Sequence, residues 1–220
     1  MDNAGIETGS GSIMLYHGSK SGITGKIAPI SREQCDFGKG FYMGTEQAQP
    51  LSLICNFPDA KLYKINLQLT DLKCLELEVG IEWALLIAYN RGRLDMIKET
   101  AIYQKLSAMT SGCDLVLGNI ANDRMFVVLD RFCESEITDS ALTNSLSALR
   151  LGRQYVAITE KACSQAIIVE EKTIGVKERN ALRYKAETHR LEGIRLADEI
   201  CKKYRRNGRF FDEILNEAVL

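Results

Sequence analysis

Two short glycine-bearing motifs constrain this chain more than any other feature of its sequence. Residues 15–19 read Leu-Tyr-His-Gly-Ser, so that His17 and Gly18 follow an apolar lead-in, and residues 36–42 read Asp-Phe-Gly-Lys-Gly-Phe-Tyr. The second motif carries two glycines, one residue apart, ahead of an aromatic segment. Because glycine has no Cβ, each motif lets a flat ligand approach the backbone closely. The sequence therefore predicts a site for a flat ligand built from these two segments.

The composition limits the chain to one sizeable core, or to one core with a helical appendage, because 45% of its 220 residues are hydrophobic. Its 28 basic and 29 acidic residues leave a formal net charge of -1, which provides no general attraction to nucleic acid or to an anionic membrane. No apolar run approaches the ~20 residues that a membrane-spanning helix needs. We therefore expect neither a membrane nor a nucleic acid as the partner.

The cysteines and histidines argue against a metal site. Seven cysteines are scattered along the sequence, never as a close pair, and the chain has only two histidines. No spacing typical of a zinc site is present, so we expect no metal. An odd number of thiols in hydrophobic segments is typical of reduced, buried cysteines, which predicts a cytoplasmic protein.

The hydrophobic periodicity changes between that of strands and that of helices along the chain, which predicts an α+β fold. The expected strands cover residues 13–16, 41–44, 62–69, 114–118, 154–159 and 165–169. The expected helices are one capped by Thr45, two between 76 and 109 that break at Arg91-Gly92, one capped at Asn122-Asp123, and one opened by Thr138 or Asp139. Residues 177–206 predict a long charged helix, and residues 210–219 predict a short amphipathic one.

These elements divide the chain into three expected parts. Residues 1–12 are polar and rich in glycine, and form a tail or a remnant foreign to the native chain. Residues 13–172 form the α+β domain, and residues 173–220 form a helical tail. The apolar stripe of the long helix is thin but includes Gly193 and Ala197, which permit close helix approach. Docking of this helix on the core and docking on a second chain, as in a homodimer, both remain open.

In this order the two glycine motifs resemble the nicotinamide-binding elements of the ADP-ribosyltransferase superfamily, on its His-Tyr-Glu branch, which includes diphtheria toxin and the poly-ADP-ribose polymerases. They resemble more closely still a bacterial family of domains within that superfamily. The resemblance covers residues 13–170 and implies split antiparallel β-sheets with helical insertions. It also implies that NAD+ is the substrate and that no metal takes part.

The resemblance assigns roles residue by residue. The histidine of the family falls on His17, which would hydrogen-bond the adenine-side ribose, and Gly18 would present its backbone to the nicotinamide carboxamide. The stacking tyrosine falls on Tyr42. Ser19, Phe37 and Gly40 complete the expected NAD+ contacts within the two motifs, and Asp36 borders the same pocket. Taken alone, His17 is more typical of a buried strand-end histidine satisfied by a carbonyl, and Tyr42 of core packing, so the assignment depends on the two motifs together.

A third element, residues 153–158 (Arg-Gln-Tyr-Val-Ala-Ile), resembles the strand that carries the catalytic glutamate, but Gln154 occupies the glutamate position. A glutamine can hydrogen-bond the nicotinamide-side ribose but brings no negative charge to an oxocarbenium-like transition state. The loss of a charge-assisted contact costs on the order of 10- to 150-fold in rate. Glu160, Glu170 and Glu171 are candidates to restore a carboxylate, although each is also typical of a solvated surface charge.

The expected catalytic residues are therefore His17, Tyr42 and Gln154. Arg124 could face the diphosphate, but also fits a surface arginine beside a helix cap. Without the glutamate that supports chain growth in the polymerases, the resemblance implies a mono-ADP-ribosyltransferase. It also implies a protein acceptor and a bacterial effector or toxin role, in the cytoplasm or secreted into a host cytosol, with a possible neutralising partner. Two alternatives are a module that binds NAD+ without turnover and an interaction protein that acts through its helical tail.

Overall fold

The computed structural model describes residues 6–121, 126–148 and 152–217. Its strands are β1 (Ile6–Thr8), β2 (Ser12–Ser19), β3 (Phe41–Gly44), β4 (Lys61–Gln68), β5 (Lys73–Leu77), β6 (Leu115–Asn119), β7 (Arg153–Ala157) and β8 (Ala166–Thr173). Its α-helices are α1 (Ala48–Ile54), α2 (Ile81–Asn90), α3 (Ala101–Ala108), α4 (Phe126–Cys133), α5 (Asp139–Leu146), α6 (Glu160–Ser164), α7 (Val176–Tyr204) and α8 (Phe211–Glu217). A 3₁₀ turn, Asp95–Ile97, precedes α3. The predicted α+β class is confirmed.

The described strands form one eight-stranded sheet in the order β1-β5-β6-β7-β3-β2-β4-β8. The pair β5–β6 is parallel, and the other neighbouring strands are antiparallel. The strands β2 and β4 pair over eight residues, whereas β2 and β3 pair only at Tyr16 and Gly44. The sheet therefore consists of two halves, β1-β5-β6-β7-β3 and β2-β4-β8, which a single residue pair joins. The expected separation into two sheets is incomplete.

Two hydrophobic cores lie on opposite faces of the sheet, because side chains alternate along each strand. In β7, Val156 points into one core, and Tyr155 and Ala157 point into the other. The first, which we call the helical core, includes Phe37, Leu75, Trp83, Leu86, Ile87, Val116, Phe132, Leu142 and Val156. The second, which we call the strand core, includes Leu15, Phe41, Met43, Tyr63, Ile65, Leu67, Leu117 and Tyr155.

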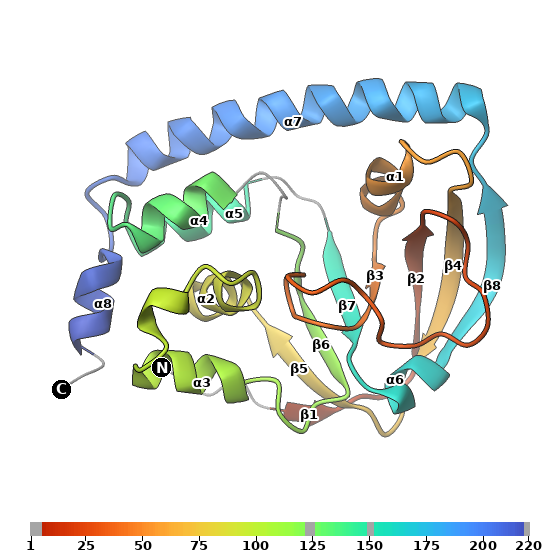
Figure 1. The fold of residues 1–220 in the computed structure, drawn as a ribbon, viewed down its shortest axis with the longest axis horizontal. Helices are drawn as coiled ribbons and strands as arrows, with labels where there is room; N and C mark the ends of the chain where they lie inside the picture. The colour runs from red at the N-terminus through yellow and green to blue at the C-terminus, as the bar shows by residue number, and fades with distance from the viewer. Residues whose placement is uncertain (1–5, 122–125, 149–151, 218–220) are drawn as a thin grey trace.

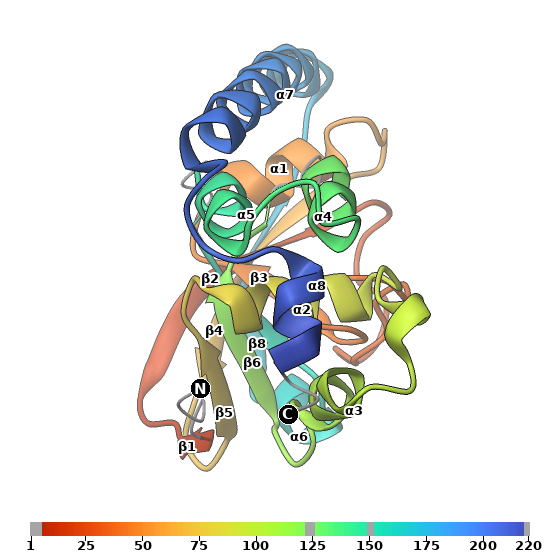
Figure 2. The ribbon, with the colours of Figure 1, turned by 90° about the vertical axis from the view of Figure 1, so that its left-hand side faces the viewer.

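The helix α2 anchors the helical core. Its residues from Trp83 to Ala88 are all buried. The indole of Trp83 is fully buried and donates a hydrogen bond from Nε1 to the Asn119 carbonyl at 3.1 Å, at the end of β6. Figure 2 shows α2 beside α8 and below α4 and α5, on the side of the sheet where β5 and β6 lie. The buried run holds α2 in the helical core, and the helix ends at Asn90, directly before Arg91.

The helix α7 runs along the molecule from the end of β8 to α8 (Figure 1). Its 29 residues correspond to about 43 Å of helix. It contacts α1 and α5, where Ala197 and Cys201 are buried. Between these contacts Tyr184 is 80% and Leu191 61% exposed. The expected long helix is confirmed, and it docks on the rest of the chain at both ends.

Several sequence-based boundaries hold. The strand predicted at 41–44 is β3, residue for residue, and two helices flank the predicted break at Arg91-Gly92, where Gly92 has a φ of +71°. Thr138 caps α5 by accepting a hydrogen bond from the backbone N–H of Ala141 at 3.3 Å. The cap predicted at Asn122-Asp123 lies outside the described residues.

Other predictions need correction. Thr45 does not cap α1, which begins at Ala48, because its hydroxyl instead accepts from the backbone N–H of Arg153 at 3.0 Å. The strands β1 and β5 and the helix α6 were not anticipated, and β8 extends to Thr173. Within the segment 1–12, which we set apart from the domain, β1 pairs with β5.

The described residues hold no helix with the length and apolar character that crossing a bilayer requires. They also hold no group of three or more side chains arranged to ligate a metal ion. All seven cysteines are free thiols.

Candidate functional site

His17 lies where the two half-sheets part. The pairing of β2 with β3 stops at Tyr16 and Gly44, and beyond it the His17 side chain bridges the two strands. Its Nδ1 lies 2.7 Å from the carbonyl oxygen of Tyr42, and its ring stacks on Phe41 with 4.2 Å between the centroids. A carbonyl only accepts, so Nδ1 carries the proton and Nε2 has a lone pair. Nε2 has no hydrogen-bond partner in the part of the chain that the structure describes.

Burial lowers the pKa of His17 below its ordinary value of 6.5, and the hydrogen bond to the Tyr42 carbonyl offsets part of this effect. The imidazole is therefore neutral at pH 7. A neutral ring held by Nδ1 presents Nε2 as a hydrogen-bond acceptor, which suits a hydroxyl donor such as that of a ribose.

Stability should therefore fall with acidification through His17. Its folded pKa lies below its unfolded value, so the unfolded chain binds more protons as the pH drops below about 6.5. We expect the free energy of unfolding in urea to decrease from pH 7.5 to 5.5 more steeply in a protein that keeps His17 than in its His17→Gln variant. Both proteins should carry His189→Gln, which removes the second histidine. Equal slopes would contradict this assignment.

Tyr42 is tied into its own motif. Its hydroxyl donates to the Gly38 carbonyl at 2.7 Å and accepts from the backbone N–H of Phe37 at 3.0 Å. Burial raises the pKa of the Tyr42 phenol far above its ordinary value, so the hydroxyl stays protonated. The ring packs against the helical core, whereas the His17 ring stacks on Phe41 of the strand core. The carbonyl of Tyr42, rather than its ring, is what His17 contacts.

The glycines of both motifs allow close packing within the chain. A Cβ on Gly40 would lie 2.5 Å from Cγ1 of Val156, and Gly38 has a φ of +78°. A Cβ on Gly18 would lie 2.9 Å from the Pro50 carbonyl oxygen, because α1 covers this side of β2. Ser19, the last residue of β2, is half-buried and pairs with Lys61. The backbone of Gly18 is therefore less open than the sequence alone indicates.

Gln154 belongs to a buried polar cluster that the sequence did not reveal. On β7 it lies across from Gly44 of β3 and Gly118 of β6. Its Nε2 donates to Oδ2 of Asp36 at 2.9 Å. Oδ1 of Asp36 accepts from Nε of Arg91 at 2.7 Å and also from Nη2. The three side chains form what we call the Asp36 cluster, in which Asp36 and Arg91 are each 7% exposed and Gln154 6%.

The Asp36 cluster is held in place by its neighbours. Asn90 donates from Nδ2 to the backbone carbonyl of Asp36 at 3.1 Å. The Asn119 carbonyl accepts from Gln154 Nε2 at 3.3 Å as well as from the Trp83 indole. The end of α2, the loop before β3 and the ends of β6 and β7 thus meet at one buried carboxylate.

The three glutamates that we considered as replacements do not join Gln154. Glu160 is exposed in the first turn of α6. Glu170 and Glu171 lie on β8, and β3, β2 and β4 separate this edge strand from β7. Glu171 instead pairs with Lys61, at 2.5 Å. The carboxylate beside Gln154 is that of Asp36, and Arg124 lies outside the described residues.

Arg91 is the residue of this cluster that sequence reasoning missed. It follows α2 next to Gly92, so its position indicated only a helix break. A buried arginine needs a carboxylate partner, but the sequence holds 29 acidic residues, and Asp36 lies 55 positions away. Only the packing of α2 on the loop before β3 brings the two together.

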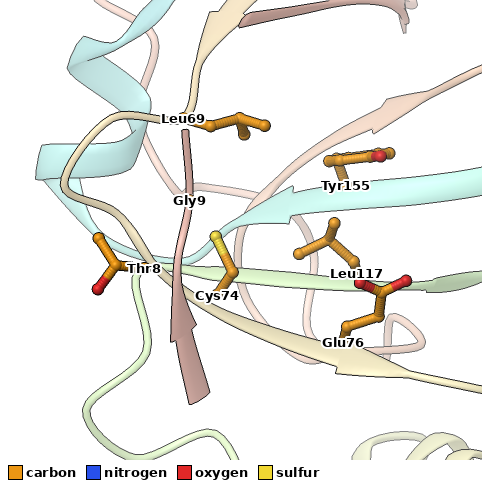
Figure 3. Close-up of a pocket in the computed structure, with 7 residues that line it drawn as sticks. All are labelled: Thr8, Gly9, Leu69, Cys74, Glu76, Leu117 and Tyr155. Carbon is orange, nitrogen blue, oxygen red and sulfur yellow. The ribbon is translucent and has the colours of Figure 1, made fainter. Parts of the chain in front are cut away.

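A cavity of about 370 Å³ opens on the opposite face of the sheet. Figure 3 shows Glu76, Leu117 and Tyr155 side by side on one wall, with Leu69, Cys74 and the backbone at Gly9 around the opening. Tyr155 points to the strand core, opposite to its neighbour Gln154. A ligand in this cavity would therefore meet neither Gln154 nor the Tyr42 ring.

The sequence model of the family described as "Protein of unknown function (DUF3990)" matches residues 13–167. The chain belongs to this family. The DUF3990 match includes both glycine motifs and β7, and it ends before α7 begins. No curated protein sequence matches the chain.

Among solved structures, the chain is similar to the crystal structure of the M. tuberculosis MbcT-MbcA toxin-antitoxin complex. The identity is 10% and the TM-score 0.43, over 80% of this DUF3990 chain and 91% of the other. A TM-score below 0.5 is too low for this likeness to bear on function.

Proposed function

We propose that this chain cleaves NAD+ and transfers a single ADP-ribose unit to an acceptor, which we take to be a protein side chain. The observation that carries the proposal is His17, a neutral histidine at the parting of two half-sheets, with Nδ1 bound and Nε2 available. In the His-Tyr-Glu branch, which the sequence resembles, this histidine binds the adenine-side ribose. A ribose hydroxyl that donates to Nε2 would meet that requirement.

The proposed reaction balances without a metal or redox partner. The bond between the nicotinamide nitrogen and the ribose carbon breaks, and its electron pair leaves with neutral nicotinamide. A lone pair on the acceptor forms the new bond to the same carbon, and the proton of the acceptor passes to solvent. The ribose carbon develops oxocarbenium character, so an acceptor group beside it stabilises the transition state. Gln154, in the glutamate position, would supply that group.

The sequence resemblance also supports a place for this protein on the His-Tyr-Glu branch, with its split-sheet architecture. The parting of β2 from β3 after one residue pair is compatible with such a fold. The bacterial effector or toxin role and the neutralising partner belong to the same proposal. A solvent-exposed stretch of α7 around Tyr184 is available to such a partner.

Labelled NAD+ tests the reaction. We expect the purified protein, incubated with a cell lysate and NAD+ labelled in its adenylate half, to label a protein band and to release nicotinamide. His17→Ala should reduce both signals by at least about 10-fold, because it removes the acceptor for the ribose hydroxyl. His189→Ala is the matched control and should retain both. Labelling that survives in His17→Ala would rule out this site.

The second candidate is a module that binds NAD+ without turnover, and the glutamine at position 154 favours it. In that case NAD+ would raise the melting temperature, because it binds the native state, but no nicotinamide would be released. A protein that neither releases nicotinamide nor shifts its melting temperature with NAD+ would overturn both candidates.

A further inference from the structure

We propose that Asp36 is a positioning residue that locks Gln154 as a hydrogen-bond acceptor toward the substrate. The orientation of Gln154 follows from the buried contacts alone, and its consequence for turnover rests on the proposed function. Asp36 would then supply, through the amide of Gln154, part of the negative charge that a glutamate at this position would bring directly.

The neighbours of Gln154 determine which end of its amide faces inward. The inward atom lies 2.9 Å from Oδ2 of Asp36 and 3.3 Å from the carbonyl oxygen of Asn119. Asp36 forms an ion pair with Arg91, and its carboxylate oxygen and the Asn119 carbonyl oxygen are both acceptors. The inward atom must therefore be the NH₂ group, with both hydrogens donated. Oε1, the remaining polar atom, has no partner among the described residues.

One oxygen of the carboxylate that sets this orientation is already occupied. Arg91 donates to Oδ1 from both Nε and Nη2, which anchors this oxygen to the guanidinium. Asn90 holds the Asp36 backbone through its carbonyl oxygen. With Oδ1 occupied, Oδ2 is the oxygen left for Gln154. The cluster thus selects one of the two amide orientations of Gln154.

An amide that donates to a carboxylate becomes a better acceptor at its oxygen, because hydrogen bonds in series polarise one another in a buried site. The negative charge of Asp36 therefore strengthens Oε1 of Gln154 as an acceptor. At the ribose of NAD+, this oxygen would face the carbon on which positive charge develops. Gln154 would act there as a polarised neutral group, and Asp36 would act only through it.

Asp36→Asn tests the arrangement with little change in volume. Asparagine has one acceptor oxygen, and Arg91 keeps it because a guanidinium is the stronger donor. The new NH₂ group then faces the NH₂ group of Gln154. The contact of Gln154 with residue 36, at 2.9 Å, is shorter than its contact with the Asn119 carbonyl, at 3.3 Å, so it decides the orientation and Gln154 turns Oε1 inward. We expect kcat for nicotinamide release to fall about 10- to 100-fold with KM nearly unchanged. Asp95→Asn, at an exposed ion pair, is the control and should keep the wild-type rate.

Gln154→Glu gives a second test, in which the two interpretations of Gln154 predict opposite changes in rate. If Gln154 only replaced a catalytic glutamate and had no role of its own, restoring the glutamate would raise the rate. With Asp36 in place, two carboxylates would meet at about the 2.9 Å that now separates Asp36 from the Gln154 amide, and they would repel. We therefore expect Gln154→Glu to be slower than the wild type. The double variant Asp36→Asn with Gln154→Glu should be faster than Gln154→Glu, because the introduced asparagine amide can donate to the new carboxylate.

Side-chain amide exchange provides a readout that needs no turnover. In the wild type the two Gln154 amide protons should exchange with solvent at least about 100-fold more slowly than those of an exposed glutamine, because both are donated in a buried site. Their NMR signals are identified by their loss in Gln154→Leu, and Asp36→Asn should accelerate their exchange. Rapid exchange in the wild type would overturn the inference whatever the protein does to NAD+.

The remaining outcomes are also decisive. Slow amide exchange without any NAD+ turnover would overturn the proposed function and leave the orientation of Gln154 standing. An Asp36→Asn variant that raises KM without lowering kcat would show that Asp36 contacts NAD+ itself, which would overturn the positioning role. If Asp36→Asn fails to fold, the exchange measurement on the wild type and the rate of Gln154→Glu still decide.

Discussion

Arg91→Met is expected to lower the free energy of unfolding by about 3–5 kcal/mol, because it leaves the buried Asp36 carboxylate without its counter-charge. Methionine keeps most of the aliphatic length of arginine, so the loss reports on charge more than on packing. Asp36 and Arg91 are each 7% exposed, which leaves little room for water to compensate. Urea titration followed by far-ultraviolet circular dichroism measures the change.

Two further variants separate the charge effect from a general effect of losing arginine. Arg93→Met removes an arginine that pairs with Asp130 at 3.3 Å on the half-exposed surface, and should cost at most about 1 kcal/mol. Adding Asp36→Asn to Arg91→Met should recover part of the lost stability, because the unpaired charge is then gone. An Arg91→Met protein within about 1 kcal/mol of the wild type would mean that Asp36 needs no cation.

Trp83→Ala should be about as damaging, at about 3–5 kcal/mol, because it removes the largest fully buried side chain and leaves a cavity below the sheet. Trp83→Phe retains much of the volume and loses the Nε1–H bond to the Asn119 carbonyl, which still accepts from Gln154. We expect a smaller loss of about 1–2 kcal/mol for this variant. Trp83 is the single tryptophan of the chain, so both variants lose the tryptophan fluorescence signal. Unfolding is therefore followed by circular dichroism. Similar losses for both variants would contradict a packing role for the indole.

The secondary structure could be predicted where local signals agree. An apolar-aromatic run bounded by glycines predicts β3, helical periodicity predicts α2, dense alternating charge predicts α7, and a threonine at the right place predicts the start of α5. The strand β5 was missed because its sequence, Lys-Cys-Leu-Glu-Leu, is short and adjoins a helix with a similar apolar content. The prediction that Thr45 caps α1 was wrong because a hydroxyl ahead of a helix can also accept a hydrogen bond from a neighbouring strand. Here it accepts from the backbone N–H of Arg153.

The candidate site could be predicted only in part, for a physical reason. Motifs report what a short segment presents, so His17, Tyr42 and Gln154 could be singled out from their neighbours in sequence. Contacts between distant segments are set by packing. The sequence therefore could not predict that Asp36 pairs with Arg91 or that α1 covers Gly18. The motif glycines illustrate the limit, because a missing Cβ fits both a bound ligand and a closely packed helix.

The single residue pair between β2 and β3 has a mechanical consequence. On one side of it β2 is secured by eight pairs with β4, and on the other side β3 is secured by four pairs with β7. Separating the two half-sheets along this line would break one backbone pair and leave the β2–β4 and β3–β7 pairings intact, but it would also open the strand core, which takes side chains from both halves. Two side-chain contacts of His17 also cross this line, its stacking on Phe41 and its bond to the Tyr42 carbonyl. The imidazole that we propose as a substrate contact therefore also links the two half-sheets.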